Sequence, residues 1–168
     1  FMNVKQVKVT EVGPRDGFQS EKTLLKTEDK VDIINHLIKA GFQRIEVSSF
    51  VSPKAIPQLA DAATILENVK RNSNATLAAL VPNAKGALRA VDAKLDEIVV
   101  FLSASESHNK TTVNRSVQDS LTGFREIADI AGKNNIPVQG DIATAFGCPF
   151  EGNVSAKKLA DISKEYKL

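Results

Sequence analysis

Val9-Thr-Glu-Val-Gly-Pro-Arg-Asp-Gly-Phe-Gln19 is the stretch on which the prediction of the fold depends. A β-rich run ends at Gly13-Pro14, and Arg15, Asp16 and Gln19 follow at once. A strand that ends in a cation, a carboxylate and an amide places chemical groups at its C-terminal end. Active sites of parallel α/β barrels lie at that end, because the loops after the strands converge there over a packed core.

The side chains of this loop also suggest what it does. The carboxylate of Asp16 can hold a hard divalent cation, and the guanidinium of Arg15 can face the negative charge that such a cation helps to create. A simpler interpretation is an Arg-Asp pair that closes a turn between two glycines. We favour function, because catalytic residues gather on loops that a rigid scaffold carries.

The composition fits one globular domain or part of one. The chain has 168 residues, of which 42% are hydrophobic, enough to form one sizeable core. Lysine and arginine total 22 against 20 aspartate and glutamate residues, which gives a formal net charge of +2. These charges are interspersed, and this pattern argues against a nucleic-acid or membrane-surface partner.

Cysteine content and hydropathy bear on the compartment. Cys148 is the single cysteine, so no disulfide can form within the chain, which suits a reducing compartment. No apolar run approaches the roughly 18 to 20 residues of a membrane span, and the first residues contain no signal-peptide core. We therefore expect a cytoplasmic protein, or a mitochondrial-matrix protein if a leader has been removed.

Five strand-then-helix units follow one another along the chain. Alternating apolar residues predict a first strand with Val7 and Val9 on one face, and the continuous run Ile98-Val-Val-Phe-Leu102 predicts a strand buried on both faces. Polar loops are expected at 103–114 and 146–152. The strands are predicted at 4–12, 43–48, 76–81, 97–103 and 136–143, and the helices at 27–41, 58–69, 84–93, 117–134 and 155–166.

This strict alternation predicts an α/β fold with parallel strands and right-handed crossovers. It fits a doubly wound sheet or the first five units of a TIM (β/α)8 barrel. No Gly-x-Gly-x-x-Gly follows the first strand, which weakens the nucleotide-binding open sheet. Polar residues follow every strand, as expected where a barrel gathers its site from the whole ring. We therefore predict that residues 1–168 form the N-terminal part of one barrel domain.

Five motifs resemble one enzyme family in the same order. They are Gly13-Pro-Arg-Asp-Gly-Phe-Gln19, Glu46-Val-Ser-Ser-Phe-Val-Ser-Pro-Lys54, Val81-Pro-Asn83, Ala104-Ser-Glu106 and Gly147-Cys-Pro-Phe-Glu-Gly152. Along essentially its whole length the chain is similar to the 3-hydroxy-3-methylglutaryl-CoA (HMG-CoA) lyases, in the superfamily of metal-dependent lyases and Claisen-condensing barrels. Condensing relatives such as isopropylmalate and homocitrate synthases share the first motif but not the second and fifth.

The resemblance implies a reaction, a cofactor and roles for residues. The family cleaves HMG-CoA to acetyl-CoA and acetoacetate with a divalent cation, Mg²⁺ or Mn²⁺, in leucine degradation. By this resemblance Asp16 is a metal ligand, Arg15 stabilises the enolate, and Glu46 is important for activity near the substrate hydroxyl. The same resemblance suggests substrate-binding positions, which are Arg15, Gln19, Ser49, Asn83 and Cys148.

The chain also departs from the family. The family's other metal ligands, a His-x-His pair and a later Asn, and its glycine-rich loop with a catalytic cysteine have no counterpart here. We expect His36 to be structural or solvated and His108 to be solvated. We expect Cys148 to line the pocket or pack rather than react. Contacts of Lys54 and Glu106 with a CoA-sized ligand are no better supported than a polar loop face.

A barrel of this type needs about 250 residues, so we expect the isolated chain to be inactive. Unpaired strand edges would favour self-association as a homo-oligomer. Three alternatives to HMG-CoA lyase stay open: a lyase for a longer-branched 3-hydroxyglutaryl-CoA, a condensing enzyme, and a non-catalytic half-barrel that assembles with a partner chain.

Overall fold

A parallel sheet of four strands forms the centre of the computed structural model, which describes residues 7–71 and 74–166. The strands pair in the order in which they occur along the chain, and each pair is parallel. They are β1 (Arg44–Ser49), β2 (Thr76–Leu80), β3 (Glu97–Ser103) and β4 (Val138–Ala143). The four later predicted strands are therefore confirmed, with ends that differ by one or two residues.

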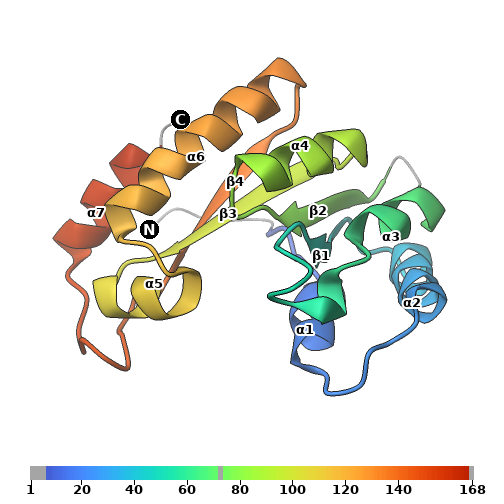
Figure 1. The fold of residues 1–168 in the computed structure, drawn as a ribbon, viewed down its shortest axis with the longest axis horizontal. Helices are drawn as coiled ribbons and strands as arrows, with labels where there is room; N and C mark the ends of the chain where they lie inside the picture. Colours follow the sequence, from blue (N-terminus) through green and yellow to red (C-terminus); the bar gives the residue numbers. More distant parts are fainter. Residues whose placement is uncertain (1–6, 72–73, 167–168) are drawn as a thin grey trace.

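Helices connect these strands and lie along the outside of the curved sheet (Figure 1). Side-chain caps mark where four of them begin, because Asn83, Ser105, Ser116 and Ser155 each accept a hydrogen bond from the backbone N–H three residues ahead. The helices are α1 (Phe18–Ser20), α2 (Thr27–Lys39), α3 (Ala62–Asn68), α4 (Ala84–Asp92), α5 (Glu106–Val113), α6 (Val117–Lys133) and α7 (Ala156–Glu165). A short 3-10 turn, Pro57–Leu59, precedes α3.

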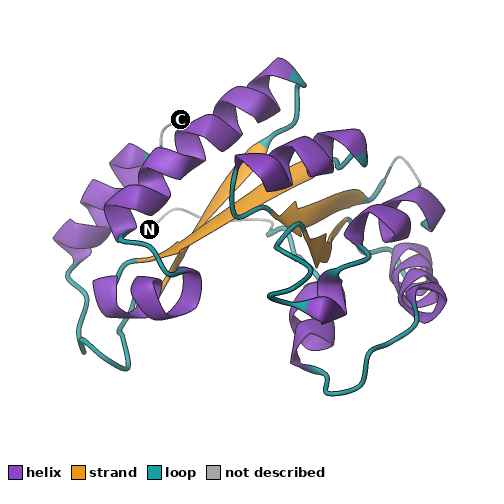
Figure 2. Cartoon of the chain, viewed as in Figure 1, coloured by secondary structure: helices purple, strands orange, loops and turns teal. Residues whose placement is uncertain are grey.

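The two faces of the sheet differ in chemistry. Successive residues of a strand point to opposite faces, and the apolar set packs with the helices in one core that includes Ile45, Leu77, Ile98 and Leu102. The other face is the inside of the curve (Figure 2). The strand register places a polar set on this inner face, namely Arg44, Glu46, Thr76, Glu97, Gln139 and Asp141. Arg44 and Glu46 are buried and the other four are half-buried. In a barrel this face points to the interior, and functional groups gather at its C-terminal end, where the loops after the strands converge.

The first predicted strand is largely wrong. Residues 1–6 lie outside the described part of the chain, and in residues 7–12 the pairing is a single parallel bridge between Glu11 and Ile45. Val7 and Val9, predicted to share one face of a strand, are 75% and 64% exposed. This segment has β1 on one side, and in the described chain no strand covers its other edge, so its valines gain little by burial. Four of the five units are thus complete, and the first contributes one residue of pairing.

Two predicted loops are helical. Gly13–Gly17 forms one π-helical turn, η1, that continues into α1. The polar stretch 103–114 contains α5, which has no apolar stripe and whose one buried residue is Asn109. The Asn109 side chain accepts from Ser103 N at 2.9 Å and donates to Arg115 O at 2.9 Å. Buried hydrogen bonds, rather than a hydrophobic face, therefore hold this helix against the sheet.

Candidate active site at the C-terminal edge of the sheet

The η1 turn is fixed to the sheet by Glu11. The Glu11 backbone makes two hydrogen bonds to β1. Glu11 N donates to Arg44 O at 3.0 Å, and Glu46 N donates to Glu11 O at 2.8 Å. The Glu11 carboxylate accepts a hydrogen bond from Gly13 N at 2.6 Å. Arg15 and Asp16 both donate their backbone N–H to Val12 O, which closes the turn. The residues after this turn are therefore held beside the end of β1.

Arg15 lies between two carboxylates. Its Nε donates to Glu46 Oε1 at 2.5 Å, and its Nη1 donates to Asp16 Oδ1 at 2.7 Å. The Arg15 and Glu46 side chains are 19% and 4% exposed, whereas that of Asp16 is 64% exposed. Among the described residues none hydrogen-bonds to Arg15 Nη2 or to Glu46 Oε2. The arrangement thus fixes the guanidinium on two sides and leaves one of its nitrogens and one carboxylate oxygen for a ligand.

Burial controls the protonation of Glu46. Loss of water around the carboxyl raises its pKa, and the adjacent Arg15 lowers it through charge and hydrogen bonding. Asp141, on β4, raises the pKa further by repulsion, while Arg44 lowers it. The net direction is upward from the ordinary value of 4.5. A raised pKa brings a carboxyl closer to the range in which it can exchange protons with a substrate.

A second set of polar groups lies on the inner face. Arg44 donates from Nε to Glu97 Oε2 and from Nη1 to Thr10 Oγ1, both at 2.7 Å. Gln139 donates to Asp141 Oδ1 at 2.8 Å. Within the described chain, Arg44 Nη2 and Ser48 Oγ are buried without a hydrogen-bond partner. Buried polar atoms normally have one. Arg44 gives the inner face unmet hydrogen-bonding capacity, whereas Ser48 pairs with the core residue Ala79 after the bulge in β1 and does not add to this face.

The other predicted binding positions lie at the same edge with their own contacts. Gln19 is on α1 and half-buried. Ser49 is buried at the end of β1, and its hydroxyl donates to Leu80 O at 3.2 Å. The Oδ1 of Asn83 caps α4 by accepting from Gly86 N at 2.9 Å, which commits the acceptor end of that amide to the fold.

Cys148 is buried in the loop after β4. Its Sγ lies 2.9 Å from Ser105 Oγ and accepts from Phe150 N at 3.3 Å. Burial raises the pKa of the thiol, but its hydrogen bond with Ser105 and those from the Phe150 and Glu151 backbone outweigh it, and the net direction is downward. The geometry agrees with the expected packing role.

The structure brings some predicted residues together and leaves others apart. Arg15, Asp16 and Glu46 form one cluster, whereas Cys148 contacts the β3–α5 loop. His108 packs its ring 6.1 Å from that of Phe150, and Glu106 accepts from Val117 N at 3.0 Å, a role in capping α6. His36 is exposed on α2, where its Nδ1 lies 2.7 Å from Asp32 O, in keeping with the structural role expected of it.

Sequence reasoning missed several polar residues near the cluster. Glu11 supports the turn, and Arg44 and Asp141 act on Glu46 through charge. A signal was present, because Arg44 and Glu46, like Gln139 and Asp141, are two apart in a strand and must share a face. Their proximity across the sheet depends on register, which the sequence does not show.

The described residues do not by themselves form a metal site. Asp16 offers an exposed, hard carboxylate oxygen at the mouth, which fits one ligand of Mg²⁺ or Mn²⁺. In residues 7–71 and 74–166 no three His, Cys, Asp or Glu side chains are grouped to hold an ion.

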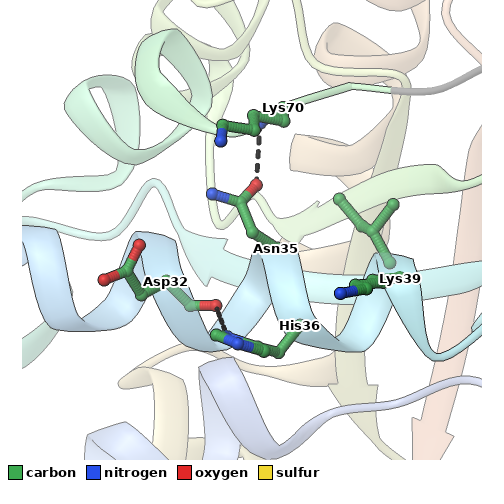
Figure 3. A pocket seen from close by; sticks show the side chains of 6 residues that line it. Asp32, Asn35, His36, Lys39 and Lys70 are labelled. Atoms are coloured by element: carbon green, nitrogen blue, oxygen red, sulfur yellow. Dashed lines mark hydrogen bonds between the residues drawn. The ribbon is translucent and has the colours of Figure 1, made fainter.

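A hollow on the outer surface lies away from this site. It is lined by Asp32, Asn35, His36, Ile38, Lys39 and Lys70, and it contains none of the predicted site residues (Figure 3).

Comparison with known proteins identifies the family. The model of the HMGL-like family matches residues 6–167. The chain belongs to this family. It is 42% identical over 161 residues to the mitochondrial hydroxymethylglutaryl-CoA lyase of Gallus gallus, covering 96% of this chain and 54% of that protein. It is 41% identical over 158 residues to the cytoplasmic 3-hydroxy-3-methylglutaryl-CoA lyase of Mus musculus, covering 94% of this chain and 46% of that one.

Solved structures of HMG-CoA lyases match the fold as well. The Bacillus subtilis enzyme superposes with a TM-score of 0.93 at 40% identity, over 96% of this chain and 54% of that chain. An HMG-CoA lyase from Acinetobacter baumannii, solved with coenzyme A and 3-methylmalate, gives 0.89 at 43% identity over 94% and 51% of the two chains. The chain therefore spans about half the length of the HMGL-like proteins that it matches, and its four parallel strands form part of their TIM barrel. No described helix is long and apolar enough to cross a membrane.

Proposed function

We propose that this chain supplies the N-terminal half of the active site of a lyase that cleaves HMG-CoA to acetyl-CoA and acetoacetate, and that residues 1–168 are part of one barrel domain. The observation that carries the proposal is the position of Arg15, held by Glu46 and Asp16 with Nη2 left for a ligand. The family match and the two HMG-CoA lyase structures support it.

The geometry suits the two charges that the reaction moves. Cleavage of the carbon–carbon bond requires a base to take the proton of the tertiary hydroxyl while the acetyl-CoA enolate leaves. Glu46 can take part in proton transfer through Oε2, because Arg15 occupies Oε1 and burial raises the pKa of the carboxyl. The free guanidinium nitrogen of Arg15 can stabilise the enolate oxygen, and its two ion pairs orient it before substrate arrives.

A divalent cation would complete the charge balance. When bound, Mg²⁺ or Mn²⁺ would polarise the hydroxyl and carboxylate oxygens of the substrate. We propose Asp16 as a ligand of this cation, because its carboxylate is exposed at the mouth of the site. The hydrogen bond from Arg15 to Oδ1 orients this carboxylate. Gln19, Ser49, Asn83 and Cys148 are proposed to line the acyl-CoA pocket at the same edge.

The substrate class, the cellular location and self-association are proposed from the relatives and from the sheet edge. The Acinetobacter structure contains coenzyme A, which supports an acyl-CoA substrate. A lyase for a longer-branched 3-hydroxyglutaryl-CoA is the second candidate, because the chain spans about half the length of its relatives and so supplies only part of the acyl pocket. Relatives are named both mitochondrial and cytoplasmic, so either location suits the proposal. The unpaired edge of β4 within the described chain supports self-association.

A chimera tests the function. The Bacillus subtilis relative is 41% identical to this chain over 160 residues. Residues 1–168 would be joined to the part of that relative that follows the matched segment. With Mg²⁺ or Mn²⁺, we expect release of acetoacetate and acetyl-CoA from HMG-CoA, and none from the isolated chain. Product from a longer-branched substrate at a higher kcat/KM would favour the second candidate. A folded chimera that consumes acetyl-CoA, or cleaves neither substrate, would contradict the proposal.

A further inference from the structure

We propose that Glu151 is a positioning residue that ties the loop after β4 to the N-terminus of α5, so that the two loops form one unit at the mouth of the barrel. The unit is defined as residues 105–108 and 146–152. Naming this edge as the substrate mouth rests on the proposed function, whereas the tie itself does not. α5 and α1 lie at the same edge of the sheet in Figure 1.

The first contact of the tie is a charge-assisted hydrogen bond. Glu151 Oε1 accepts from Ser107 N at 2.7 Å, across 44 residues of sequence. Ser107 is in the first turn of α5, where backbone N–H groups have no partner inside the helix. Hydrogen bonds from Ser107 hold the pKa of Glu151 below its ordinary value, so the carboxylate is charged at neutral pH. Lys158 Nζ, 3.9 Å from Oε2, adds a weaker attraction from α7.

The second contact of the tie joins Cys148 of the loop to Ser105, the cap of α5. Cys148 Sγ and Ser105 Oγ are 2.9 Å apart, and the same Ser105 oxygen accepts from His108 N at 3.1 Å as the cap of α5. Paired hydrogen bonds of 2.7 and 2.8 Å between the Cys148 and Gly152 backbones close the loop on itself. The loop therefore moves as one piece, and Cys148 is reached only when that piece lifts from α5.

The loop needs such a tie because little of it is packed. Phe146 and Phe150 are 101% and 60% exposed, so the hydrophobic effect does not hold them down. The ring of Phe150 lies 6.1 Å from that of His108. Besides the Glu151 bond, the hydrogen bond and the ring contact found in the described residues between the loop and α5 with its cap are Cys148–Ser105 and Phe150–His108. The Glu151 bond thus controls how often the loop that carries Cys148 separates from α5.

The single cysteine provides the test. In the 168-residue chain, the rate at which Cys148 reacts with 5,5′-dithiobis(2-nitrobenzoate) reports how often the loop opens. The charge of Glu151 raises the pKa of Cys148, so removing it changes reactivity directly. Glu151→Ala and Glu151→Gln both lose that charge, but only glutamine keeps an acceptor for Ser107 N. We expect Glu151→Ala to react about fivefold faster than Glu151→Gln, the effect of losing one hydrogen bond between neutral groups.

The control is Glu126→Ala, an exposed carboxylate on α6, which should react at the wild-type rate. Rates for Glu151→Ala and Glu151→Gln within twofold of each other would overturn the proposal. Should Glu151→Ala fail to fold, hydrogen exchange of the wild type and of Glu151→Gln decides. Lifting of the loop breaks the bond of the Ser107 amide to Glu151 but leaves the Cys148 and Gly152 amides bonded within the loop. The Ser107 amide should therefore be about fivefold more protected in the wild type than in Glu151→Gln, whose neutral acceptor is weaker, and equal protection would overturn the proposal.

Discussion

At the residue scale, the pairing of Arg15 with Glu46 is the central feature. A buried carboxylate is costly unless a partner compensates for lost water, and Arg15 supplies that partner at 2.5 Å. The compensation is incomplete, because burial and Asp141 still raise the pKa of Glu46. The proximity of Arg15 and Glu46 could be predicted, since parallel strands end at one edge. The burial of Glu46 and the influence of Asp141 could not, because both depend on register and packing.

The raised pKa of Glu46 predicts a pH dependence of stability. A carboxyl that binds its proton more tightly in the folded state contributes stability below its unfolded pKa, near 4.5, and loses it as the pH rises through the folded pKa. Glu46→Gln keeps an acceptor for Arg15 Nε but does not titrate. We expect the free energy of unfolding of the wild type, relative to Glu46→Gln, to fall as the pH rises from 4.5.

Urea unfolding of both proteins between pH 4.5 and 8 measures this difference. Glu126→Gln, which replaces an exposed carboxylate on α6, should show no such trend. A difference between wild type and Glu46→Gln that is constant, or that grows in favour of the wild type with pH, would contradict the assigned burial of Glu46.

At the element scale, Tyr166, the residue that follows α7, makes a close contact with the sheet. The ring of Tyr166 lies against the backbone of Gly140 in β4, where a methyl group would come within 2.2 Å of Tyr166 Cε1. The hydroxyl of Tyr166 donates to Asp141 O at 2.9 Å, and its ring is 5.6 Å from that of Phe124. The last helix was predicted, but the need for glycine at 140 was not, because it arises from a residue 26 positions away.

Gly140→Ala should therefore destabilise the fold. Since the added methyl group displaces the Tyr166 ring, we expect the free energy of unfolding to fall by about 1–3 kcal/mol. Gly132→Ala is the matched control, because nothing lies within 4 Å of the added atom, and alanine in a helix should be neutral or stabilising. Equal unfolding free energies for the two variants in urea would show that Tyr166 does not contact Gly140 as described.

At the scale of the whole molecule, the chain is an open part of a barrel with an apolar outer face and a polar inner face. Its alternation of strands and helices was predicted because apolar periodicity and helix starts are local signals. The first strand was not predicted correctly, because a strand needs partners and in the described chain Glu11 has one neighbour. Helix α5 was missed because its stability comes from the Ser105 cap and the buried Asn109, not from an apolar stripe.

The placement of the site follows from this architecture. Polar residues after successive parallel strands must meet at one edge, which the sequence was sufficient to predict for Arg15, Asp16 and Glu46. The inner-face residues Arg44 and Asp141 were not predicted as part of the site, because their effect on Glu46 appears only when strands far apart in the sequence curve around a shared interior.

The most direct measurement of the central claim is the kcat of Arg15→Met in the chimera with the Bacillus subtilis remainder, with HMG-CoA as substrate. If Arg15 stabilises the enolate, kcat should fall about 10²- to 10³-fold while KM changes less than about tenfold. Arg125→Met, which removes an exposed arginine paired with Glu165 on the surface, should leave both constants unchanged. A kcat for Arg15→Met within about threefold of the unsubstituted chimera would contradict the account.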